Sequence, residues 1–488
     1  MTHDTPAQTV SSPADQGRHA PQPACAAPPE PSGGWGELFT RQYAAQASIL
    51  AGGVALYAMN LYFTAALLPS IVADIGGARF YAWVATGFLT AAVIAAMLVS
   101  RLLARLGAAR AYLAGFLVFG AGAALTAASP SMATLIVGRV VQGLGGGLLA
   151  GLGYAVIRSA LPERLWTRAA GLVSAMWGVG TLVGPSLGGL FAELGLWRGA
   201  YLVLLGAALV LAVLARRSLP GPVAGGAGLA EPLPLPSLVL LTLAVAVFST
   251  SSTVPRGWPT ALCLGAGLAL LAGFVLVERG GRATVLPRLT YRRGNHLKWV
   301  YLTVAVYCAG VMTETFIPLF GQELGGLSPL AAGFLGATVS VGWTAAQLFS
   351  VNVRSVRARE LAVRIGPAVL TAGLLAYGLL QTGAASGGRV LLWAAVLVAG
   401  GTGIGVAFPH LSVAAMRSTD DEAEGAKAAA GLNTTQLIAF SLSSALAGTL
   451  VSAGGEARLD AARYLVFGLG SLTVFGVVTA ALSLRRGR

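Results

Sequence analysis

Apolar residues along most of this chain come in long runs, unlike the alternating patterns of a soluble protein. From about residue 48 such runs recur near the roughly 20-residue length that a helix needs to cross a hydrocarbon core about 30 Å thick. The pattern predicts an all-α integral membrane protein with fourteen transmembrane helices. We place them at residues 48–70, 81–103, 110–128, 131–157, 169–192, 199–215, 236–254, 258–277, 297–320, 330–352, 363–383, 389–412, 428–452 and 463–484.

The composition supports a membrane protein. Hydrophobic residues make up 56% of the 488 positions, charged residues only 10%, and the mean hydropathy is +0.75. Soluble domains carry about 25% charged residues, so this chain lacks the polar coat of a soluble protein. The three cysteines cannot form a disulfide scaffold and have no zinc-ligand spacing. We therefore expect neither a metal site nor a cofactor.

The start of the chain has a different composition. Seven of the first 35 residues are proline, and Ala, Ser, Gln and Asp lie between them. Such a segment cannot bury enough apolar surface to fold. We expect residues 1–45 to be a disordered cytoplasmic tail, with no cleavable signal peptide before the first span.

The basic residues predict the orientation in the membrane. A net charge of +14 can indicate a nucleic-acid partner, but here 20 of the 32 basic residues lie in one set of loops and only 6 in the opposite set. Short cytoplasmic loops of membrane proteins are enriched in Lys and Arg. This distribution predicts a multi-pass protein of the cell inner membrane with both termini in the cytoplasm, and no nucleic-acid partner.

An internal repeat predicts two related halves. The first span ends in Thr64-x-x-x-Leu68-Pro69 and Asp74-Ile75-Gly76, and the ninth ends in Thr313-x-x-x-Ile317-Pro318 and Glu323-Leu324-Gly325, at a constant offset of 249 residues. We expect six-helix halves at 46–217 and 296–484, a linker with two extra helices at 218–295, and a cytoplasmic tail at 485–488. Parallel repeated halves are typical of transporters whose substrate site lies between them at the bilayer midplane.

The fifth span carries a glycine pattern. Gly180, Gly184 and Gly188 lie four residues apart, so they line one helix face and leave a groove for a close neighbour. Pro185 can bend the same helix. Three such glycines alone also fit ordinary small-residue packing. The longer pattern, which adds Gly171 and Gly189, is similar to the antiporter motif of the major facilitator superfamily at every fixed position.

The fourth span carries a charge inside the membrane. Arg139, Gln142, Gly143 and Gly145 follow the spacing R-x-x-Q-G-x-G, which resembles the second motif of that superfamily. An arginine at the centre of a span costs roughly 2.5–3.5 kcal/mol. Arg139 is thus either part of the transport or proton pathway or an interior anchor bonded to backbone carbonyls.

The resemblance covers nearly the whole chain from residue 48, and the extra pair of helices resembles the fourteen-span drug/proton antiporters. It implies a major-facilitator-type fold and proton-coupled efflux of drugs or small molecules by alternating access. Two positions depart from the family. The loop after the second span keeps only Arg105 and Gly107 of its motif, and Ala104 replaces an aspartate that helps lock one conformation, so gating must rely on other contacts. Asn60 stands where the subfamily has a mid-membrane aspartate, which removes support for a preference for cationic drugs.

Glu314 is the one acidic residue clearly within a predicted span. A charged carboxylate is strongly disfavoured in the bilayer, so this group can stay neutral until water or a cation reaches it. Such a group can alternate between protonated and ionised states, as proton coupling requires. The alternative is a permanent pair with an arginine. We predict that Glu314 and Arg139 carry the proton coupling.

Polar and aromatic residues on the first, fifth, ninth and thirteenth spans are candidates for the wall of a substrate cavity, although each alone also fits plain helix packing. These residues are Tyr57, Asn60, Tyr62, Trp177, Tyr307, Phe316, Asn433 and Gln436.

One pattern in the sequence is similar to an enzyme motif but lacks the context that catalysis requires. Gly184-Pro185-Ser186-Leu187-Gly188 has the G-x-S-x-G spacing, but a nucleophile elbow needs a strand-to-helix turn and a triad histidine. The sequence therefore predicts a monomeric carrier that exports a small amphipathic or hydrophobic compound in exchange for protons. The alternative is a proton-coupled symporter for solute uptake, because fold alone does not set the direction of transport.

Overall fold

The structure is a computed structural model that describes residues 1–3, 35–219, 233–281, 283–292, 294–353, 355–419 and 422–484. In these ranges the chain is helical and contains no strand. The first group of long helices comprises α2 (Ala44–Ile75), α3 (Tyr81–Ala96), α4 (Val99–Ala127), α5 (Met132–Ala155), α7 (Trp166–Glu193) and α8 (Trp197–Ser218). Short helices α1 (Trp35–Leu38), η1 (Ala78–Phe80), α6 (Ile157–Ala160) and η2 (Glu163–Leu165) lie between or before them.

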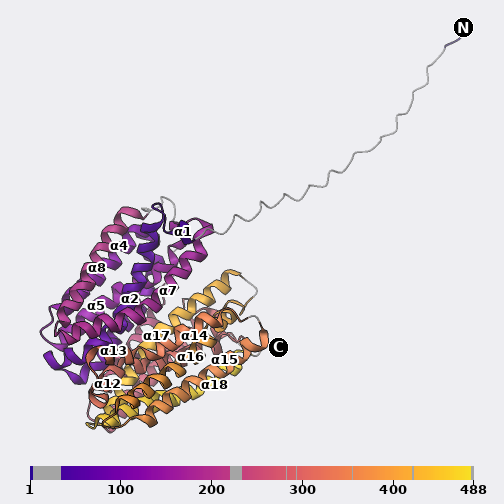
Figure 1. Cartoon of the computed structure of the whole chain (residues 1–488). Helices are drawn as coiled ribbons and strands as arrows, with labels where there is room; N and C mark the ends of the chain where they lie inside the picture. The colour runs from indigo at the N-terminus through magenta and orange to yellow at the C-terminus, as the bar shows by residue number, and fades with distance from the viewer. Residues whose placement is uncertain are drawn as a thin grey trace.

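The second group repeats this arrangement with two broken helices. It comprises α11 (Leu297–Val311), η4 (Met312–Thr315), α12 (Ile317–Gly325), α13 (Pro329–Gly336), α14 (Thr338–Ser350), α15 (Val356–Leu380), α16 (Gly387–Met416), α17 (Glu422–Gly454) and α18 (Arg458–Ser483). Between the groups lie α9 (Leu235–Thr250), α10 (Trp258–Gly280) and η3 (Arg288–Tyr291). The two groups form two bundles that lie side by side (Figure 1).

All fourteen predicted apolar segments coincide with helices, but they do not all have the length of a span. Among the described residues, eleven helices are long and apolar enough to cross a membrane, and thirteen are if each bent pair counts as one. The bent pairs are Leu297–Thr315 with Ile317–Gly325, at 42°, and Pro329–Gly336 with Thr338–Ser350, at 45°. Helix α9 is apolar but shorter than the other spans.

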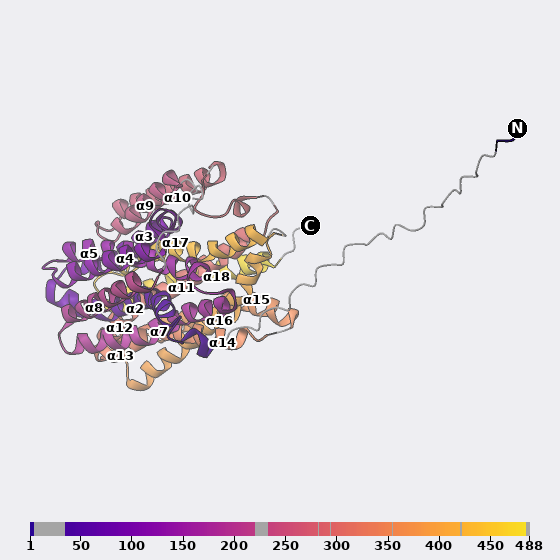
Figure 2. The same ribbon diagram turned by 90° about the horizontal axis from the view of Figure 1, so that it is seen from above.

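Helices α9 and α10 lie on one edge of the molecule, where α3 of the first half meets α17 of the second (Figure 2). The Trp83 indole N–H donates to the Ser249 carbonyl at 3.1 Å. On the other side, the hydroxyls of Ser251 and Thr449 are 2.5 Å apart. The inserted hairpin is therefore bonded to both halves.

The end of the N-terminal segment differs from the expected disordered tail. Residues 4–34 and the predicted tail at 485–488 lie outside the described residues, but α1 is helical within the range we assigned to the first tail. Leu38 is fully buried, Glu37 forms an ion pair with Arg164 at 2.7 Å, and Arg168 lies over the Trp35 ring. The proline-rich composition ends before these apolar and charged residues, which have partners in the bundle.

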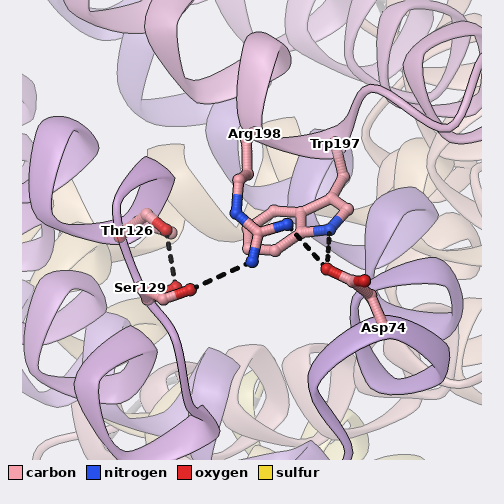
Figure 3. A network of polar contacts seen from close by, with 5 residues as sticks. All are labelled: Asp74, Thr126, Ser129, Trp197 and Arg198. Atoms are coloured by element: carbon pink, nitrogen blue, oxygen red, sulfur yellow. Dashed lines mark hydrogen bonds and ion pairs between the residues drawn. The ribbon is translucent and has the colours of Figure 1, made fainter.

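In each half, an equivalent ion pair joins two helices at the same end of the molecule. Asp74, at the end of α2, accepts hydrogen bonds from the Trp197 indole at 3.0 Å and from Arg198 at 2.6 Å, at the start of α8 (Figure 3). In the second half Glu323, at the end of α12, pairs with Arg458 at the start of α18 at 2.7 Å. Asp74 and Glu323 are matched positions of the sequence repeat. We call this side of the molecule the Asp74 end and the side where α2 begins the basic end.

Candidate functional site

A small cavity lies between the two halves, displaced from the middle of the helices toward the Asp74 end. Its volume is about 30 Å³, which is room for one or two water molecules. Both halves line it: Leu61, Tyr62, Thr64, Ala65, Leu68, Ala85, Arg139 and Pro185 from the first, and Val311, Met312, Glu314, Thr315, Pro318, Gly333, Gly336 and Ala337 from the second. A drug-sized ligand needs a pocket of about 300–1,000 Å³. The halves must separate before such a ligand can enter.

Glu314 lies where two helix breaks meet. It belongs to the 3-10 turn η4 that separates α11 from α12, and its carboxylate reaches the start of α14, just after the break at Ala337. The backbone N–H and the hydroxyl of Ser340 each donate to this carboxylate at 2.7 Å. The first amides of a helix have no partner within the helix and favour an anion. Glu314 is 4% exposed and forms no ion pair with an arginine among the described residues.

Tyr62 connects this carboxylate to the other half. Its hydroxyl lies 2.9 Å from the Ser340 hydroxyl. Because that hydroxyl donates to Glu314, Tyr62 donates to Ser340. A chain of three polar groups thus runs from α2 to Glu314, and a change at the carboxylate can reach the contact between the halves.

Arg139 is fully buried in the first half, and it also lines the cavity. Its Nη1 donates to the side-chain oxygens of Asn60 at 2.9 Å and Gln142 at 2.5 Å, and its Nε donates to the Val84 carbonyl at 3.4 Å. The guanidinium stacks over the Phe88 ring at 4.4 Å. Its Nη2 has no hydrogen-bond partner within the described residues. The expected anchoring to backbone carbonyls is limited to one long bond.

The antiporter-motif glycines have two different neighbours. A Cβ at Gly180, Gly184 or Gly188 would lie 2.6–2.8 Å from backbone atoms of α2, so these three form the groove that receives α2. Gly189 faces the second half, where a Cβ would lie 2.5 Å from the Leu330 Cα of α13. Gly171 has only the Trp35 side chain nearby, at 3.8 Å. The motif thus holds α7 against α2 and brings it against α13 at the Asp74 end.

Glycines of the fourth span also pack closely, because Gly143 lies against the backbone of Phe88 and Gly145 against that of Phe119. In the loop motif, Gly107 has a φ of 73°, a conformation that residues with a side chain rarely adopt. This conformation interrupts the helical geometry of α4. Arg105 lies before that break on the basic end, away from the cavity.

The other predicted cavity residues are dispersed. Tyr57 is buried between Phe88 and Trp177. Phe316 is buried and stacks on Tyr81 with ring centres 4.7 Å apart, which joins the halves near the Asp74 end. Tyr307 is buried inside the second half next to Gly366. Asn433 and Gln436 are half-buried on α17 and do not line the cavity.

Several residues of the site are absent from the sequence prediction, among them Ser340, Thr64 and Ala337. Ser340 holds Glu314, Thr64 and Ala337 line the cavity, and Thr64 also contacts Asn60 at 3.4 Å. A serine in an apolar span is common, and nothing local links residue 340 to residue 314. In the part of the chain that the structure describes, no group of three or more His, Cys, Asp or Glu could hold a metal ion.

Comparison with known proteins places this architecture among transporters. The family profile described as Major Facilitator Superfamily matches residues 50–444. A probable multidrug-efflux transporter of Mycobacterium tuberculosis is 45% identical over 468 residues, which cover 94% of this chain and 98% of that relative. The multidrug transporter protein MdtP of Bacillus subtilis is 24% identical over 374 residues, 73% of this chain and 66% of MdtP.

Solved structures share the fold. The crystal structure of a D-xylose–proton symporter superposes with a TM-score of 0.65 at 14% identity and covers 92% of this chain and 98% of its own. The nucleoside transporter NupG superposes with a TM-score of 0.61 at 12% identity, over 90% of this chain and 100% of its own. At these identities the likeness concerns the fold alone.

Proposed function

Because the chain belongs to the major facilitator superfamily, we propose that it is a proton-coupled efflux transporter for small amphipathic or hydrophobic compounds. The relative from Mycobacterium tuberculosis that matches almost end to end carries the name of a probable multidrug-efflux transporter. The glycine pattern of α7, which packs against α2 and α13, resembles the antiporter motif of this superfamily and so favours exchange of substrate for protons over uptake together with them.

The position of Glu314 is the observation that carries this proposal. It is a buried carboxylate without an arginine partner among the described residues, it lines the cavity between the halves, and it holds the first turn of α14 through Ser340. When it takes up a proton, the carboxyl group loses one acceptor position and its negative charge, so its hold on the Ser340 amide and hydroxyl weakens. Helix α13, which lies before the break, then becomes free to leave α7.

Arg139 is the second member of this proposed coupling pair. It lines the same cavity from the opposite half, and its positive charge favours the ionised form of acidic groups nearby. Rocking of the halves changes the separation of the two charges, which is how alternating access would be linked to protonation.

We also propose fourteen spans, with the basic end in the cytoplasm of an inner-membrane protein. The eleven long helices and two bent pairs leave α9 as the remaining segment, and α9 packs against α10, α3 and α17. If α9 failed to cross, every later loop would change sides, and the basic loops would lie outside. With fourteen spans, both termini lie in the cytoplasm. The transporter works as a monomer in this proposal.

Glu314→Gln tests the function. In inside-out vesicles with an imposed proton gradient, the unmodified protein should accumulate a fluorescent dye uphill, and the variant should lose this accumulation. Downhill exchange of the dye should persist, because the amide still accepts a hydrogen bond. Glu456→Gln is the matched control, since Glu456 is exposed in the loop before α18.

Uphill accumulation that is unchanged in Glu314→Gln would contradict Glu314 as the coupling group. Movement of substrate together with protons into intact cells would instead support the uptake symporter.

A further inference from the structure

Arg139, Asn60 and Gln142 form a buried cluster in which every atom without a hydrogen-bond partner in the described chain is a donor. A guanidinium carries five N–H groups and accepts nothing. Nη1 is used by both amide oxygens, at 2.9 Å and 2.5 Å, and Nε by the Val84 carbonyl. Nη2 remains unpartnered within the described residues although the side chain is fully buried.

The arginine also sets how both amides are turned. An Asn or Gln side chain next to a group that only donates must present its oxygen to it, so its NH2 group points elsewhere. In agreement, Asn60 Nδ2 and Gln142 Nε2 are buried without partners in the described chain. Thr64 adds a further donor to the Asn60 oxygen at 3.4 Å. Among the described residues, the three buried atoms of the cluster that have no hydrogen-bond partner are therefore all donors.

The charge of the cluster is also unbalanced. No carboxylate contacts Arg139 in the described part of the chain, and Glu314 on the far wall of the cavity is bound by Ser340. The Phe88 ring at 4.4 Å offsets only part of the cost of burying a cation. A buried arginine of this kind favours an anion with at least two acceptor oxygens.

We propose that Arg139, which lines the cavity and is held in place by Asn60 and Gln142, forms a subsite for a carboxylate on the transported compound, so that the substrate supplies the counter-ion the protein lacks. The rest of the cavity wall is largely apolar, with Leu61, Leu68, Val311, Met312 and Pro318, and fits the hydrophobic body of an amphipathic acid. This assignment rests on the proposed function in one respect, that the cavity widens to admit substrate.

The membrane potential supports the same substrate class. Export of an anion from a cytoplasm at negative potential moves charge in the favourable direction. A cationic compound would be exported against that potential and would meet Arg139 at the cavity wall.

A binding measurement without any gradient tests the subsite. Purified protein in lipid nanodiscs is titrated with 4-(1-pyrenyl)butyrate and with its methyl ester, and the fluorescence of empty nanodiscs is subtracted. The acid should bind about tenfold more tightly than the ester, because charge-assisted bonds to the guanidinium are lost with the charge.

Asn60→Asp is the decisive variant. It places a carboxylate where the Asn60 oxygen now lies, 2.9 Å from Arg139, and so supplies an internal counter-ion. Binding of the acid should weaken about tenfold, while binding of the ester stays unchanged. Asn352→Asp, at an exposed position after α14, is the matched control and should leave both affinities unchanged.

Folding of the variant is checked by its elution profile and Tm. If Asn60→Asp does not fold, Gln142→Glu makes the equivalent change at the other contact of Arg139. Equal affinities for acid and ester, no binding of the acid, or acid binding that is unaffected by both variants would overturn the subsite. The proposed efflux function is tested separately by the proton dependence of transport, so either idea can fail alone.

Discussion

Glu314 and Arg139 are two charged groups in the interior of the bundle, and their environments differ. The carboxylate has two donors from Ser340, one of them an amide at the start of a helix. The guanidinium has neutral amide oxygens and a ring face but no anion among the described residues. Charged residues inside apolar runs can be found by reading the sequence. The partners Ser340 and Asn60 could not be predicted, because they lie on other helices.

The hydroxyl of Tyr62 is expected to help hold the halves together at the Asp74 end. Tyr62→Phe removes the 2.9 Å contact with Ser340 and keeps the ring. A hydrogen bond contributes about 1 kcal/mol, or roughly a fivefold change in population. In a chain whose native cysteines are replaced by alanine, Leu330→Cys should therefore react about fivefold faster with a membrane-impermeant maleimide when Tyr62→Phe is added.

Tyr464→Phe, at an exposed position of α18, is the control for this experiment. An unchanged labelling rate in Tyr62→Phe would show that the chain from Tyr62 to Glu314 does not stabilise the closed arrangement.

At the scale of helices, glycine residues and helix breaks have different structural roles. The glycines of α7 let it approach the backbone of α2, whereas the breaks near Glu314 and Ala337 free backbone amides at the cavity. The glycine groove follows from four-residue spacing and was predicted. The breaks were not, since Pro318 and the short apolar segments around residue 337 are equally compatible with straight helices.

Gly184→Val is expected to destabilise the packing of α7 on α2. Its Cβ would lie 2.8 Å from the Met59 carbonyl oxygen and 2.9 Å from the Tyr62 Cβ, and backbone cannot move aside cheaply. Overpacking of this kind costs about 1–3 kcal/mol, so the Tm in detergent should fall by several degrees.

Gly206→Val is the matched control, because Gly206 lies on α8 and a Cβ at this position would have nothing within 4 Å. Equal Tm values for the two variants would mean that the groove does not determine stability.

At the scale of the whole molecule, the inserted hairpin bridges the seam between the halves. Helix α9 is bonded to α3 through Trp83 and to α17 through Thr449, and the Arg256 guanidinium donates to the Ser452 carbonyl at 2.9 Å. This edge of the seam is therefore covered, and access for a substrate from the bilayer is expected elsewhere.

Cysteine labelling tests whether both helices of the hairpin cross the membrane. Pro255 and Arg292 are exposed, one between α9 and α10 and the other after α10. In a cysteine-free chain, Pro255→Cys should react with an impermeant maleimide in intact cells, and Arg292→Cys only after lysis. Labelling of Arg292→Cys in intact cells, or protection of Pro255→Cys, would contradict the fourteen-span arrangement.

The amino-acid sequence determined by itself which segments are helical and which residues carry charge inside them. These properties follow from hydropathy, glycine spacing and the distribution of arginines, all of which act locally or through the solvent. The matched pairs Asp74–Arg198 and Glu323–Arg458 agree with the repeat seen at residues 74 and 323.

Only the tertiary structure decided which of those residues meet. It joined Glu314 to Ser340 and, through Ser340, to Tyr62. It left Nη2 of Arg139 without a hydrogen-bond partner among the described residues and separated Tyr307, Asn433 and Gln436 from the cavity. Each of these outcomes depends on the rotation and tilt of helices far apart in the chain. Those are set by the close packing of many side chains at once, which no local pattern encodes.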